Sequence, residues 1–206
     1  AMGEIAESGM QKKPYMMQGF YQYGLGNLYT LYGGGQFSEN YLSVAVGHSF
    51  NSPLGGISMD ITRAKSRLKN NKTSTGNSFN LGFSKYMEAT ETNITLAAYR
   101  YSSKGFYSLR DAAAERYGMT RDYYLVDYRT KQRFSVNLSQ PLPGNSRVVL
   151  SGSFYQYWND SRTSNQYSLS YNKTQRLFSW SIGIGRSYNG EGKNTNSILL
   201  SASIPL

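Results

Sequence analysis

Residues 176–206 read RLFSWSIGIGRSYNGEGKNTNSILLSASIPL, and this stretch decides the fold class. Large apolar side chains occupy every second position on both sides of a polar break at residues 189–194. The apolar members are Phe178, Trp180, Ile182, Ile184, Ile198, Leu200 and Ile204. The residues between them are mostly Ser and Gly, which predicts strands with two chemically different faces. Two such strands joined by a short polar loop predict an antiparallel hairpin.

The same period of two continues upstream through most of the chain. Further strands are predicted near residues 15–24, 27–34, 42–47, 57–62, 79–84, 94–97, 134–139, 148–154 and 167–171. This makes about eleven strands, several of them longer than the ~5–6 residues usual in globular sheets. Tilted membrane strands need ~9–11 residues. The pattern therefore predicts an all-β fold, an antiparallel transmembrane β-barrel fragment of about 10–12 long strands.

One segment departs from the strand pattern. Ser108-Leu109-Arg110-Asp111 is followed by three alanines and later by Gly118, which predicts a capped short helix with a glycine stop. This helix lies in the longest connection between strands. Long loops on one side are typical of outer-membrane barrels.

Composition excludes several classes of protein. The 206 residues include no cysteine and one histidine, His48, so neither a disulfide framework nor a nucleophile and base triad can form. We expect no enzymatic activity, no cofactor and no metal. No run approaches the ~20 apolar residues of a membrane-spanning helix, which excludes a helical membrane protein. The mean hydropathy of −0.54 says little against a barrel, whose polar lumen keeps this value low.

The faces of the strands favour a barrel over a soluble sandwich. A sandwich exposes charged residues on its polar face, whereas the polar face here consists mainly of Ser, Gly, Asn and Tyr. We expect the apolar residues named above to face lipid. The candidates for a hydrated lumen are Asp60, Asn80, Ser135, Asn137, Ser168, Ser170, Ser179 and Ser181. Of these, Asp60 is the exceptional carboxylate, positioned to hydrogen-bond across a pore wall.

The net charge of +10 raises the question of an anionic partner. Part of it comes from a basic run of Arg63, Lys65, Arg67, Lys69 and Lys72. A nucleic-acid site needs aromatic and basic residues that converge on one face, but the tyrosines here are spread over all the strands. We therefore expect a solvated loop or a contact with lipid headgroups, and no nucleic-acid partner.

Several short motifs, in order along the chain, resemble the translocation barrel of fimbrial ushers, the outer-membrane pores of the chaperone/usher pathway. They are Leu31-Tyr32-Gly33-Gly34 with Gln36, Glu39 and Tyr41; Leu54-Gly55-Gly56 with Ser58, Asp60 and Thr62; Tyr99-Arg100-Tyr101-Ser102 with Gly105-Phe106; Leu138-Ser139-Gln140-Pro141-Leu142; Leu150-Ser151-Gly152-Ser153 with Tyr157-Trp158; and Ser203-Ile204-Pro205-Leu206. Together these motifs cover nearly the whole chain from about residue 11.

The resemblance implies a non-enzymatic pore segment in the bacterial outer membrane. Such a pore secretes pilus subunits that a periplasmic chaperone delivers, and it anchors the growing pilus. In the full-length protein the implied partners are these subunits and the chaperone, together with membrane lipid or detergent. We expect residues 1–10 to be a cloning remnant and a partial strand, and residues 11–206 to be part of the barrel. No counterpart of the family's plug, N-terminal or C-terminal domains is recognised.

Two other classes and one structural question stay open. A porin-like or adhesin barrel would share the alternation, and a soluble, basic, Tyr-rich β-domain would bind nucleic acid or glycan.

A partial barrel also leaves two edge strands, whose unpaired backbone groups must find partners in a membrane. We expect the edges to close on each other within one chain, with residues 3–9 supplying a missing strand or with a parallel closing pair. The alternative is self-association of two copies through these edges.

Overall fold

The computed structural model describes residues 2–4, 14–117, 129–158, 163–190 and 194–204. Twelve strands in this part of the chain form one sheet, in which each strand pairs antiparallel with the next. The elements are β1 (Met2–Glu4), β2 (Tyr15–Leu25), β3 (Tyr29–Ser38), β4 (Tyr41–Ser52), β5 (Gly55–Arg67), the 3-10 turn η1 (Lys69–Asn71), β6 (Thr73–Met87), β7 (Thr92–Ser102), α1 (Leu109–Tyr117), β8 (Thr130–Leu142), β9 (Ser146–Tyr157), β10 (Thr163–Thr174), β11 (Ser179–Tyr188) and β12 (Asn194–Ser203).

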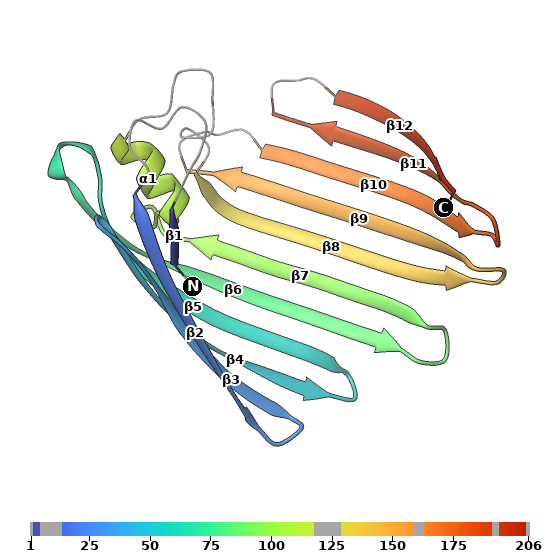
Figure 1. Ribbon diagram of the computed structural model, residues 1–206, viewed down its shortest axis with the longest axis horizontal. Helices are drawn as coiled ribbons and strands as arrows, with labels where there is room; N and C mark the ends of the chain where they lie inside the picture. The colour runs from blue at the N-terminus through green and yellow to red at the C-terminus, as the bar shows by residue number, and fades with distance from the viewer. Residues whose placement is uncertain (1, 5–13, 118–128, 159–162, 191–193, 205–206) are drawn as a thin grey trace.

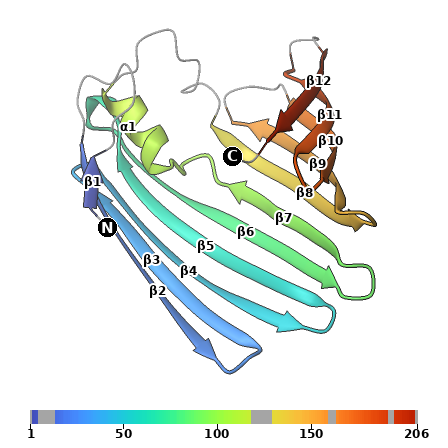
Figure 2. The same ribbon diagram turned by 45° about the vertical axis from the view of Figure 1, so that its right-hand side comes forward.

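The sheet is long-stranded and bent. Strands β2 to β12 contain between 10 and 15 residues each, which confirms the prediction of long antiparallel strands. Figure 1 shows the strands in chain order, and Figure 2 shows that the sheet curves into a trough with α1 at one end of its concave side. The prediction of an antiparallel barrel fragment with one short helix is thereby confirmed.

Helix α1 begins where the sequence predicts it. The Asp111 amide donates to Ser108 Oγ over 3.2 Å, and the Ser108 amide donates to Asp111 Oδ2 over 3.3 Å. This reciprocal pair is a capping box, which satisfies amide groups that have no partner inside the helix. The predicted glycine stop, Gly118, lies outside the described residues.

Three consecutive alanines let α1 lie close to the sheet. Ala112, Ala113 and Ala114 are all buried. Ala112 belongs to a small core cluster with Tyr41 and Ala64, which Leu68 and Phe106 complete. The end of the helix is held as well, because Arg116 Nη1 donates to the Leu68 carbonyl over 2.9 Å.

The segment before α1 also depends on close backbone approach. A Cβ atom added at Gly76 of β6 would collide with the backbone of Gly105 and Phe106. The Ser74 hydroxyl donates to the Gly105 carbonyl over 2.9 Å across the same contact. Phe106 is thereby carried onto the concave face of the sheet, where it joins the cluster under α1.

The edges of the sheet differ from the expected closure. β1 pairs with β2, with Gly3 opposite Met16, so a twelfth strand does come from the N-terminal segment. Within the described residues, however, β1 and β12 are the two outer strands of an open sheet. The expectation of intrachain closure is therefore not met in this part of the chain, where each strand pairs only with its neighbours along the sequence. The last two residues of the predicted C-terminal edge strand, Pro205 and Leu206, lie outside the described residues.

No helix in the described ranges has the length and apolarity to cross a membrane.

We predict that Ala112→Leu loosens the docking of α1. The added carbons enter a packed cluster, and overpacking of this kind costs about 1–3 kcal/mol. Hydrogen exchange of the amides of residues 109–117 should become faster in the variant. Arg110→Lys is the control, because it changes an exposed residue of the same helix and keeps its charge, so exchange should stay as in the parent chain. Equal exchange in the two variants would contradict the assigned packing.

Candidate functional site

A row of side chains crosses six strands at one level of the concave face. In an antiparallel sheet, directly opposed residues lie on the same face, so the register identifies the members. From β3 to β8 they are Tyr32, Gly47, Asp60, Asn80, Arg100 and Arg133. Two of them, Asp60 and Asn80, are residues that the sequence predicts for the lumen.

Hydrogen bonds join the members of this row around Asp60. Asn80 Nδ2 donates to Asp60 Oδ1 over 2.6 Å, and the Tyr32 hydroxyl donates to Asp60 Oδ2 over 3.4 Å. Tyr32 reaches across β4 because Gly47 lies between it and Asp60. A Cβ atom on Gly47 would approach the Tyr32 ring to 2.5 Å and Asp60 Cβ to 2.6 Å. The carboxylate thus accepts hydrogen bonds from β3 and β6, in a network that spans four strands, as expected for a group that hydrogen-bonds along a pore wall.

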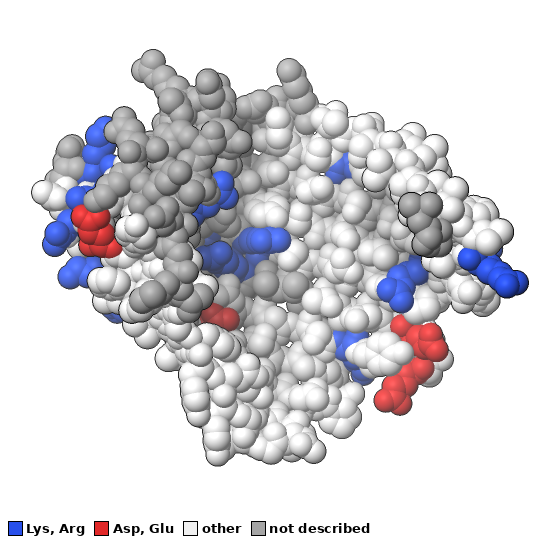
Figure 3. All heavy atoms as spheres, viewed as in Figure 1, with Lys and Arg blue, Asp and Glu red and all other residues white. Residues whose placement is uncertain are grey.

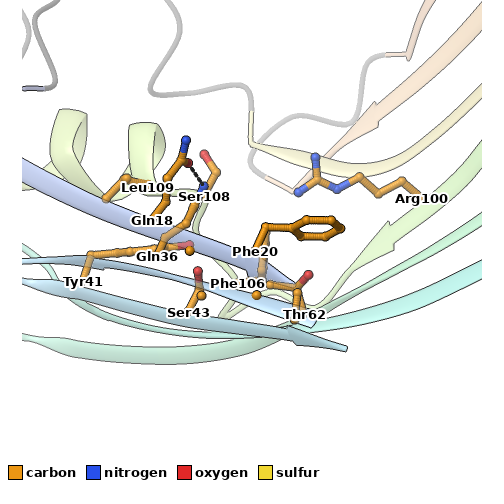
Figure 4. A pocket seen from close by; sticks show the side chains of 14 residues that line it. Gln18, Phe20, Gln36, Tyr41, Ser43, Thr62, Arg100, Phe106, Ser108 and Leu109 are labelled. Atoms are coloured by element: carbon orange, nitrogen blue, oxygen red, sulfur yellow. Dashed lines mark hydrogen bonds between the residues drawn. The ribbon is translucent and has the colours of Figure 1, made fainter. Parts of the chain in front are cut away.

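Beside this row, the concave face and α1 enclose a hollow of about 540 Å³. Figure 4 shows Gln18 and Gln36 close to Ser108 and Leu109, with Arg100 on the other side of the hollow, beyond Phe20. Gln36 Nε2 donates to Gln18 Oε1 over 3.4 Å. The Arg100 guanidinium donates to Ser78 Oγ over 3.1 Å and lies 5.6 Å from the centre of the Phe106 ring. The hollow is lined by amide, hydroxyl and guanidinium groups together with a few aromatic rings.

A buried arginine fastens the connection around the hollow. Arg129 Nη1 donates to the carbonyls of Lys104 and Phe106 over 2.8 and 3.3 Å. Its guanidinium lies 4.0 Å from the centre of the Tyr107 ring. Burial raises the pKa of the Tyr107 phenol above its ordinary value, although the charge of Arg129 acts in the opposite direction. Arg129 therefore ties the end of the long β7–β8 connection to its beginning at Lys104 and Phe106.

The other half of the concave face carries short hydroxyl and amide side chains. Asn137 Nδ2 donates to Ser151 Oγ over 3.0 Å, and the register continues from Ser151 to Ser168. Ser181 and Ser201 share a hydrogen bond of 2.6 Å. The register puts Ser135, Ser170, Ser179 and the residues just named on the face that holds Asp60. Figure 3 shows this hollowed face as mostly uncharged.

The opposite, convex face is apolar and exposed. Ile182 pairs with Leu200, and Ile184 pairs with Ile198, so these four residues share one face with Trp180. The Trp180 ring lies 5.4 Å from that of Tyr171 on the neighbouring strand. Phe178 and Ile204 lie just outside β11 and β12 and are 39% and 73% exposed. The assignment of the two faces to lumen and lipid stays a prediction.

Sequence reasoning missed the residues that depend on α1. Arg100 and Phe106 line the hollow. Arg129 donates to the Phe106 carbonyl although the two residues are 23 positions apart along the chain. The three alanines were the available signal, since small side chains permit close helix packing. They could not indicate which strands the helix would contact.

The concave face has the chemistry of a hydrated surface and not that of a binding site for one ligand. Most of its groups are neutral, so they exchange hydrogen bonds with water easily and do not fix one ligand. Among the described residues, no three His, Cys, Asp or Glu side chains lie close enough to hold a metal ion. Long antiparallel strands with a polar concave face and an apolar convex face define the wall of a transmembrane β-barrel.

The comparison with family models gives the particular family. The model described as outer membrane usher protein matches residues 1–206, and the chain belongs to this family, which is located in the outer membrane. It is 33% identical to the usher YehB of Escherichia coli over 100% of this chain and 26% of that protein. It is 38% identical to the usher HifC of Haemophilus influenzae over 93% of this chain and 23% of that protein.

Solved structures agree with this assignment. The chain is 27% identical to the translocation pore of the P pilus usher PapC, with a TM-score of 0.71, over 100% of this chain and 41% of that one. It is similar, with a TM-score of 0.74 and 27% identity, to PapC in a P pilus tip assembly intermediate, PapC-PapD-PapK-PapG, over 100% of this chain and 26% of that one. The chain spans about a quarter of the length of the curated relatives it matches.

We predict that Gly47→Ala separates Tyr32 from Asp60. The new methyl group occupies the space that the Tyr32 ring crosses, and the resulting strain should lower the free energy of unfolding by about 1–3 kcal/mol. Urea unfolding in detergent micelles measures this loss. Gly19→Ala is the control, since nothing lies within 4 Å of a Cβ there. In a Tyr32→Ala background the cost of Gly47→Ala should be smaller, and an unchanged cost would refute the role of the tyrosine.

Proposed function

We propose that this chain forms part of the wall of an outer-membrane pore through which pilus subunits are secreted. The observation that carries the proposal is the concave face, where Asp60, Asn80, Asn137 and a set of serines present small hydrogen-bonding groups. A face of this kind stays hydrated and offers no large apolar surface to which a passing protein would adhere. Membership in the usher family and the likeness to the PapC pore support the same reading.

The proposed partners follow from the family. In the PapC assembly, the usher occurs together with PapD, PapK and PapG in an intermediate of pilus tip assembly. We infer that this chain likewise takes part in pilus assembly, with pilus subunits and their periplasmic chaperone as partners of the complete pore. We also infer that its role is transport and anchoring of the pilus and that it catalyses no reaction.

The proposal assigns Ile182 to lipid and Ser181 to the lumen. An arginine on the lipid face at mid-depth costs about 2–4 kcal/mol. Ile182→Arg should therefore impair folding into bilayers, whereas Ser181→Arg should be tolerated because its side chain stays in water. The measurement is the fraction of protein that resists unfolding on an unheated SDS gel after insertion into vesicles. Equal losses in the two neighbouring variants would count against the assignment of the faces.

A crosslinking experiment tests secretion itself. Residues 1–206 replace the matching segment of the Salmonella typhimurium usher FimD, to which the chain is 32% identical over 203 residues. A photo-crosslinking amino acid at Ser168 should capture pilus subunits during secretion, because Ser168 belongs to the concave face. The same group at the adjacent Leu169, on the convex face, should capture none. Subunits captured equally at both positions, in a chimaera that inserts normally, would overturn the proposed pore wall.

A further inference from the structure

A stripe of three cations lies on the convex face of β5, which the proposed pore turns toward lipid. Arg63, Lys65 and Arg67 alternate with Ala64 and Ser66 of the strand and with Leu68, which directly follows it. The second set is buried on the side of α1, and the three cations are exposed. Residues two apart in a strand are separated by about 7 Å, so the stripe presents three regularly spaced positive charges.

Polar side chains of β6 accompany each cation. Asn77 is opposite Arg63, Thr75 is opposite Lys65, and Thr73 is opposite Arg67. Directly opposed residues share a face, so each level of the stripe combines a positive charge with a hydroxyl or amide group. Among the described residues, no acidic side chain is recorded as an ion-pair partner of Arg63, Lys65 or Arg67. This combination suits a phosphate group, which accepts several hydrogen bonds as well as carrying negative charge.

On its other side the stripe borders apolar residues. Val44 is opposite Arg63, and Leu42 is opposite Lys65. Further along β5, Ile61 pairs with Val46 and Phe79 in the apolar band of the convex face. The face therefore changes from apolar to cationic within two residues of one strand, which matches a lipid whose phosphates lie at the edge of its acyl chains.

The end of the sheet at which the stripe lies identifies the leaflet. β5 ends at η1, on the side where the longest connection, between β7 and β8, also lies. At the opposite end the connections are short, such as residues 53–54 and 143–145. Outer-membrane barrels have short periplasmic turns and longer extracellular loops. Figure 3 shows Lys and Arg gathered at this end, near the β5–β6 connection. The stripe thus lies in the outer leaflet, whose lipid is lipopolysaccharide.

We propose that Arg63, Lys65 and Arg67 bind the phosphate groups of lipopolysaccharide, with the acyl chains lying against Leu42 and Val44. The inference rests on the proposed function in one respect, because it requires the convex face to meet lipid. It adds a specific lipid partner and a position on the outside of the pore wall. The ligand is recognised by spaced phosphates beside acyl chains, so a singly charged phospholipid should bind more weakly.

The test compares two triple variants of the chain in detergent micelles, with bisphosphorylated lipid A as the probe and native mass spectrometry as the measurement. R63Q/K65Q/R67Q removes the stripe. K85Q/K173Q/R176Q removes three charges at the opposite end of the sheet, where β6 and β10 end. We expect the first variant to bind lipid A at least about tenfold more weakly, and the second to bind it like the parent chain.

Lipid A without its phosphates, and phosphatidylglycerol, should both bind more weakly to the parent chain than bisphosphorylated lipid A does. Equal binding by the stripe variant and the parent, an equal loss in both variants, or equal binding of phosphatidylglycerol would overturn the proposal. Insertion is measured separately by heat-dependent gel migration in vesicles. A parent chain that inserts but binds no lipid A contradicts this inference alone, whereas a chain that does not insert contradicts the proposed function as well.

Discussion

The structure depends on the pairing of backbone N–H and C=O groups between neighbouring strands. In hydrocarbon an unpaired backbone group costs several kcal/mol, so a chain that crosses a membrane with strands must satisfy these groups through its neighbours. The twelve strands do this in the simplest order, each with the next along the chain. The two outer strands retain an unpaired edge within the described residues. A closed wall therefore requires further strands or another copy, and self-association through the edges stays a prediction.

Once the strands pair in this way, the alternation of residue types puts polar side chains on the concave face and apolar side chains on the convex face. Register carries one face without interruption from Tyr32 through Asp60 and Asn80 to Arg100, even though the pairing shifts beside Leu81 and Thr95. The β3–β8 half of this face holds a carboxylate with its donors and two guanidinium groups. The β8–β12 half holds mainly serine and asparagine. Arg147, opposite Asn172, adds one cation to this half at the end of the sheet away from α1.

Helix α1 makes one end of the trough different from the other. Its alanines permit contact with the sheet, while Arg116 and Arg129 donate to backbone carbonyls and so attach the connection at several points. Strand β5 packs against α1, and on its convex side Arg63, Lys65 and Arg67 face outward. Because Ala64, Ser66 and Leu68 are buried against the helix segment, the outward direction of these cations follows from the packing on the concave side.

The sequence by itself determined the fold class, the approximate positions of the strands, the capped helix and the membership suggested by the motifs. These properties are local, since alternation with period two and a Ser-x-x-Asp cap are both encoded within a few neighbouring residues. It also singled out Asp60, because a carboxylate on a face of small residues is unusual. Tertiary structure alone decided that Tyr32 crosses Gly47 to reach that carboxylate, that α1 lies over β5, and that β1 and β12 stay unpaired with each other among the described residues. These features depend on the register and curvature accumulated over many strands, and no short stretch of sequence specifies either one.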